Sequence, residues 1–157
     1  MKKGDLLKEL RQDFDSFKKE TGLKLSFDEL EENFSFSNMI LDAGYVPNQI
    51  GKVISSIIAS KFRDWHTYLN GLLIPNPNYF SSQTEAKLFN SKEDKNKIWD
   101  LIKISMKISS ASSVANLNED EKKIKDFIDS AFISWKEKFM PEIKKIIERA
   151  NNAWSKD

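Results

Sequence analysis

Apolar residues recur every three or four positions along most of the chain, and no stretch alternates convincingly between apolar and polar residues. A period of three to four places apolar side chains on one face of a helix, whereas a half-buried strand needs a period of two. The sequence therefore predicts an all-α fold. The expected helical segments are residues 5–21, 27–43, 47–74, 84–89, 91–113 and 118–154.

The ends of several segments carry residues that are typical of helix termini. Gly22 and Gly44 follow two segments, where glycine suits the left-handed backbone of a C-terminal cap. Ser26 and Glu29 form the pattern of a capping box, and Ser91 is typical of an N-terminal cap. These local signals support the helical assignment independently of the apolar pattern.

Other residues are expected to bend or interrupt helices. We expect Pro47 in the first turn of its helix, and Pro141 either to kink the last segment or to start a new helix. The serine-rich run at 109–113 predicts the end of one helix, and Asn118 is the expected cap of the next. The segment at 27–43 is expected to break near Ser35.

A chain of 157 residues has the size of one domain. Connections that are mostly short favour antiparallel neighbours. We therefore expect residues 1–157 to form a single helical domain, an antiparallel four-helix-type bundle with one or two additional short helices.

The composition of the chain mainly excludes certain kinds of site and partner. The chain has no cysteine, which excludes disulfides, zinc–thiolate sites and thiol nucleophiles. Its net charge of +1 favours neither a nucleic-acid partner nor an anionic membrane. Charged side chains interrupt both the N-terminal segment and the apolar stretch at 50–74, so we expect no signal peptide, no membrane span and a cytoplasmic location.

No residue pattern indicates a catalytic centre or a metal site. His66 is the only histidine, and Asp64 lies two positions away, a spacing that does not share a helix face. We expect this histidine at the edge of the core. The acidic clusters fall in first turns of predicted helices, where carboxylates stabilise the helix dipole. The sequence favours a protein that is not an enzyme and predicts no catalytic residue, metal or cofactor.

Candidate binding residues are Trp65, His66 and Tyr68 in the third long segment, and Tyr79 and Phe80 in the irregular connection that follows it. Helical proteins often place binding surfaces in such connections. The competing interpretation of Tyr79 and Phe80, which the sequence favours, is that both rings fold back over one end of the bundle.

The function expected from the sequence is protein interaction or self-association, with another protein or a second copy in a homodimer as the partner. Two alternatives stay open. One is a small-ligand-binding bundle with an aromatic pocket formed by Phe62, Trp65, Tyr68 and Trp99.

The second alternative is a metal-dependent nucleotide pyrophosphatase. Helical enzymes of this kind hold magnesium between two acidic pairs at helical spacing. The residues that could supply such pairs are Glu29, Glu32, Asp126 and Asp129.

Overall fold

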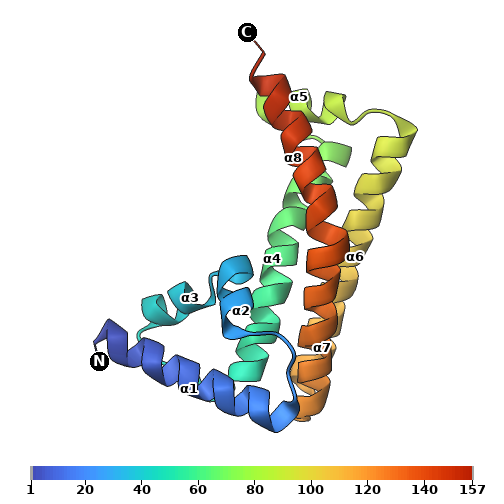
Figure 1. The fold of residues 1–157 in the computed structure, drawn as a ribbon. Coiled ribbons are helices and arrows are strands. Elements are labelled where there is room, and N and C mark those ends of the chain that lie inside the picture. Colours follow the sequence, from blue (N-terminus) through green and yellow to red (C-terminus); the bar gives the residue numbers. More distant parts are fainter. Residues whose placement is uncertain (1, 157) are drawn as a thin grey trace. The chain divides into compact units, whose positions relative to one another are not determined.

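The computed structural model describes residues 2–156, and these residues form an all-α bundle without strands (Figure 1). The predicted fold class is confirmed. The helices in chain order are α1 (Lys3–Thr21), α2 (Phe27–Phe34), α3 (Phe36–Ala43), α4 (Ile50–Leu73), α5 (Phe80–Leu88), α6 (Lys92–Leu117), α7 (Glu121–Ser134), the π-helical turn η1 (Trp135–Phe139) and α8 (Met140–Trp154).

The helices gather into two compact units, each with its own core. Unit 1 comprises residues 2–61 and 110–132, and unit 2 comprises residues 62–109 and 133–156. Helices α4, α6 and α7 supply residues to both units. The single domain expected for the whole chain stays a prediction.

The core of unit 1 is aromatic. Phe14 of α1 meets Phe27 of α2 edge to face, with ring centroids 5.4 Å apart, and Phe27 in turn meets Phe36 of α3. Phe34 packs against Phe132 of α7 in the same way. Edge-to-face contacts of this kind add to the free energy gained from apolar burial.

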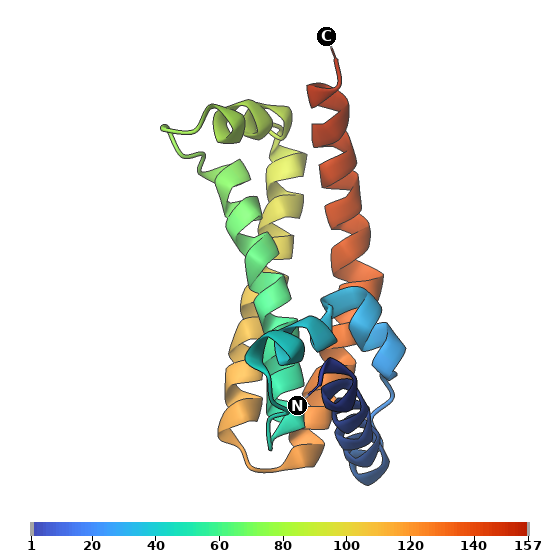
Figure 2. The same cartoon turned by 90° about the vertical axis from the view of Figure 1, so that its left-hand side faces the viewer.

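Unit 2 contains the second half of α4, the first half of α6, and α8, which run alongside one another (Figure 2). Phe62 of α4 is fully buried and contacts Trp135 and Phe139 of η1, with ring centroids 5.0 and 4.8 Å away. Leucine and isoleucine side chains from all three helices complete the core. No helix within residues 2–156 combines the length and apolar character that a membrane crossing requires.

The caps expected at Gly22, Gly44, Ser26 and Ser91 are confirmed, and the Ser91 hydroxyl accepts from the Asp94 amide at the start of α6. Gly22 and Gly44 end α1 and α3 with φ angles of 75° and 78°. Ser26 and Glu29 form the predicted capping box of α2. Ser35, at φ 51°, separates α2 from α3. The Glu31 carboxylate stabilises this turn by accepting hydrogen bonds from the amide and the hydroxyl of Ser37.

Three expectations about helix ends are wrong. Pro47 lies before α4, which begins only at Ile50. Helix α6 continues through the serine run, because the buried Ser112 hydroxyl bonds to Ser55 of α4 instead of competing for its own backbone. Asp120, and not Asn118, caps α7 through its Oδ1 atom; the Asn118 amide donates to the end of α6.

Pro141 lies at the start of a helix, which is one of its two expected positions, and α5 begins earlier than expected. The chain stays helical through η1 into α8, and Pro141 lies in the first turn of α8, where its missing N–H is not needed. Helix α5 begins at Phe80, four residues before the expected Thr84, so the irregular connection is shortened to residues 74–79.

Candidate functional site

The candidate site lies in unit 2, where α4 ends, segment 74–79 turns and α5 begins; we call this region, residues 67–88, the α4–α5 corner. Pro75 follows α4 and cannot continue it. The turn is ordered by its own polar contacts: the Asn78 amide donates to Asn76 Oδ1, and Gln83 Nε2 donates to the Pro77 carbonyl. These bonds connect residues within the turn and attach it to α5.

A pocket of about 320 Å³ opens in the corner. Five of its lining residues contribute hydroxyl groups. The lining comprises Thr67, Tyr68, Gly71, Leu72, Tyr79, Ser81, Ser82 and Glu85. The structure thereby brings together two of the residues expected from the sequence, Tyr68 and Tyr79, from either side of the turn.

Glu85 is the acidic group of this pocket, and both of its oxygens have partners. The Tyr68 hydroxyl donates to Oε2 over 2.7 Å, and the Trp154 indole N–H donates to Oε1 over 2.8 Å. Burial raises the pKa of Tyr68 well above its ordinary value, and the hydrogen bond to Glu85 and the carboxylate's charge raise it further. Tyr68 is therefore a protonated donor at neutral pH, which suits binding better than proton abstraction.

Around this pocket, large apolar side chains face solvent. Ile74, Tyr79 and Phe80 are 73%, 63% and 79% exposed. The expectation that the two rings fold back over the end of the bundle is wrong. Helix α5 buries none of its side chains fully, so Phe80 in its first turn has no core to enter.

A second hollow, of about 440 Å³, lies where this corner meets the start of α6; we call it the Lys87–Lys95 groove. Its apolar wall is formed by Leu72, Leu73 and Pro75, together with Pro77 and Ala86. Lys87 and Lys95 are exposed, and neither forms an ion pair within residues 2–156. No acidic residue occurs among the described residues that line the groove.

The two other residues expected from the sequence differ in their surroundings. Trp65 is half-buried and meets Tyr68 edge to face, with ring centroids 6.1 Å apart, so it borders the corner. His66 lies half-buried at the edge of the core, with Nδ1 3.0 Å from the Ser105 hydroxyl. The same Ser105 hydroxyl lies 2.8 Å from the Ile102 carbonyl, to which it can donate. The structure does not bring His66 into the pocket.

The aromatic pocket expected from Phe62, Trp65, Tyr68 and Trp99 is not formed. Phe62 is enclosed in the core by other aromatic rings. Trp99 is exposed on α6, beneath the Lys103 ammonium. These two residues therefore have separate surroundings, and only Trp65 and Tyr68 adjoin.

The carboxylates considered for magnesium have other positions and partners. Glu29 accepts from the Ser26 amide in the capping box, while Glu32 and Asp126 are exposed. Asp129 accepts from two backbone amides, at Lys24 and Leu25. No group of three or more potential metal ligands occurs between residues 2 and 156, so the geometry that a helical pyrophosphatase needs is not present there.

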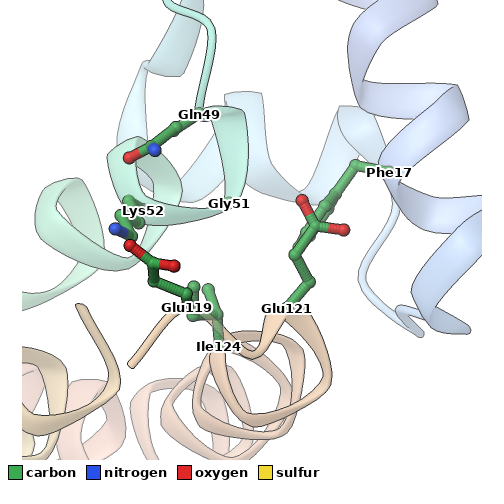
Figure 3. Close-up of a pocket in the computed structure, with 7 residues that line it drawn as sticks. All are labelled: Phe17, Gln49, Gly51, Lys52, Glu119, Glu121 and Ile124. Atoms are coloured by element: carbon green, nitrogen blue, oxygen red, sulfur yellow. The ribbon is translucent and has the colours of Figure 1, made fainter. Parts of the chain in front are cut away.

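Unit 1 holds a further pocket, of about 290 Å³, that sequence reasoning missed (Figure 3). Figure 3 shows Gln49, Lys52 and Glu119 on one side, with Glu121 nearer to Phe17 on the other. Its lining comes from α1, the start of α4 and the start of α7, positions that no local motif connects. Lys52 contributes one ammonium group, and Glu119 and Glu121 contribute two carboxylates. The pocket therefore favours neither an anionic nor a cationic ligand.

Comparisons with protein-family models, with curated proteins and with solved structures found no match to this chain.

Proposed function

We propose that the protein is a non-enzymatic binding module that contacts a partner protein through the α4–α5 corner. The observation that carries this proposal is the exposure of Ile74, Tyr79 and Phe80 within seven consecutive positions. Exposed apolar side chains gathered in one place are typical of interaction sites, and tyrosine is among the residues that contribute most to binding energy.

The polar contacts within the corner support the same interpretation. Its turn is held by the bonds at Asn76 and Gln83, and α5 is attached to α4 and α8 by the Glu85 carboxylate. A surface that is already ordered loses little conformational entropy when a partner binds. Tyr79 and Phe80 lie on the segment that these bonds connect to α4 and α8.

The experiment compares partners captured from extracts of the source cells by three proteins: the wild type, the corner variant Y79S/F80S and the control variant M39S/Y45S. The control removes two exposed apolar side chains of unit 1. We expect a partner that the wild type and the control retain and the corner variant loses. With that partner purified, calorimetry should show binding weakened at least about tenfold, equivalent to about 1.4 kcal/mol.

Circular dichroism serves as the folding control, since both replaced side chains of the corner are exposed. If the corner variant captures the same partners with the same affinities as the wild type, the proposal is wrong.

A second candidate function is the binding of a small polar ligand in the hydroxyl-lined pocket. Its volume of about 320 Å³ lies at the lower end of the range of ligand pockets. Native mass spectrometry of freshly purified protein tests this candidate. A mass above that of the bare chain, lost in the variant S82W, supports it; a bare mass after incubation with sugars and polyols counts against it.

A further inference from the structure

The Lys87–Lys95 groove restricts the chemistry of what can occupy it. Its wall of Leu72, Leu73 and Pro75 favours an apolar side chain. Lys87 and Lys95 lie at the same hollow without an ion partner, so carboxylates are the complementary groups. A matching segment must therefore combine an exposed apolar residue with acidic residues close in sequence.

Such a segment exists in the chain itself, at the turn between α6 and α7; we call residues 114–121 the acidic tip. Leu117 is 85% exposed, and Val114 one turn before it is also exposed. Glu119 and Glu121 follow within four residues and are exposed as well.

The acidic tip is an ordered projection. The Asn118 side chain donates to the Val114 carbonyl at the end of α6, and the Asp120 side chain caps the start of α7. Leu117 is therefore presented by two capped helix ends, and ordering it for binding costs little entropy.

We infer that the acidic tip of one copy docks into the Lys87–Lys95 groove of a second copy, with Leu117 against the apolar wall and Glu119 and Glu121 facing the two lysines. This inference rests on the proposed function, because it names the partner of the α4–α5 corner. The two surfaces match in both charge and apolar character.

Because the tip and the groove are different surfaces, two copies can exchange both contacts across a two-fold axis, or association can continue into chains or closed rings. A single turn inserted into a groove buries less area than a standard stable interface. The assembly is thus weak, dependent on concentration, and weakened by salt, which screens exposed charges.

The test uses sedimentation velocity on the full chain at low and high salt. The groove variant is K87E/K95E and the tip variant is E119K/E121K. Each variant alone places like charges opposite each other, and we expect association weakened at least about tenfold. The mixture of both variants restores association, because the intact tip of one meets the intact groove of the other. The quadruple variant also restores it, because both charges are reversed.

Two control variants match these changes in net charge at exposed positions elsewhere. K107E/K144E matches the groove variant, and D13K/D15K matches the tip variant. We expect both to associate like the wild type. A neutral tip variant, E119Q/E121Q, guards against a folding defect at the start of α7, and circular dichroism is recorded for all proteins.

A wild type that stays monomeric at every concentration overturns the inference, as does a mixture that associates no better than its components. These results leave the proposed function intact if Y79S/F80S still loses a partner in the capture experiment. If Y79S/F80S also keeps every partner in the capture experiment, both the inference and the proposed function are wrong.

Discussion

The Tyr68 hydroxyl and the Glu85 carboxylate, 17 positions apart, form a hydrogen bond of 2.7 Å that joins α4 to α5. The second oxygen of the same carboxylate accepts from Trp154 at the end of α8. Helix α5 itself has no fully buried side chain. Its C-terminal end is held by Phe89, which follows it and is 2% exposed, and by Arg149 of α8, which donates to the Leu88 carbonyl. The polar bridge at Glu85 is a second attachment of α5 within unit 2.

Replacing Tyr68 by phenylalanine should therefore destabilise the protein. The change removes a half-buried hydrogen bond to a charged acceptor and leaves Glu85 with one partner, which costs about 1–2 kcal/mol of unfolding free energy. Urea denaturation followed by circular dichroism measures it. Tyr45→Phe, at an exposed tyrosine, is the control and should change stability by less than about 0.5 kcal/mol. Equal stabilities of the two variants would contradict the assigned bridge.

The same contact predicts how stability depends on alkaline pH. Burial raises the pKa of Tyr68 in the folded protein, and Glu85 raises it further. In the unfolded chain the pKa of a tyrosine is about 10. Above about pH 10 the unfolded chain releases a proton that the folded chain keeps, so stability falls as pH rises.

Urea denaturation of the wild type and Tyr68→Phe at a series of pH values between about 8 and 11.5 measures this effect. We expect the variant to lose less stability over the interval, because lysine titration is common to both proteins. Parallel curves would show that Tyr68 titrates alike in the folded and unfolded states.

The parts of the fold that sequence predicts well depend on neighbouring residues. The capping box at Ser26 and Glu29 and the glycine cap at Gly22 each involve positions within a single turn. The continuation of α6 could not be foreseen, because the hydroxyl partner of Ser112 is Ser55, 57 positions earlier. A serine run looks like a helix end until its buried partners are known.

The candidate site divides in the same way. The sequence singled out Tyr68 and Tyr79, which line one pocket, and Trp65, which borders it. It did not identify Glu85, whose partner Trp154 is 69 positions away. It also placed Phe62 in a ligand pocket, although that side chain belongs to the buried face of α4.

Replacing Asp129 tests a long-range contact within unit 1. Its carboxylate accepts from the backbone amides of Lys24 and Leu25, which precede α2, with N–O distances of 3.1 and 3.3 Å to Oδ1. Asp129→Ala leaves both amides without this acceptor, and we expect the free energy of unfolding to fall by about 1–3 kcal/mol in urea denaturation.

Asp126→Ala is the matched control, because Asp126 also pairs with Lys125 but is exposed. It should cost less than about 0.5 kcal/mol, as surface substitutions usually do. Similar losses in both variants would assign the effect to Lys125.

Two glycines of α4 should respond to alanine with opposite signs. A Cβ atom at Gly51 would lie 2.7 Å from two ring carbons of Phe17 and 3.3 Å from Ile124. Phe17 is buried, so its ring cannot move aside freely. Overpacking of this kind costs about 1–3 kcal/mol, while the helix-propensity gain is small in the first turn. We expect Gly51→Ala to lower the unfolding free energy.

At Gly71 the nearest heavy atom to an added Cβ is Ser82 Oγ, at 3.6 Å, an ordinary van der Waals contact. Only the propensity gain then remains, and we expect Gly71→Ala to raise the unfolding free energy by up to about 1 kcal/mol. Urea denaturation of both single variants measures the two signs. Stabilisation by both would mean that the Phe17 ring yields to the new methyl group, and that the close approach of α1 to α4 does not depend on glycine.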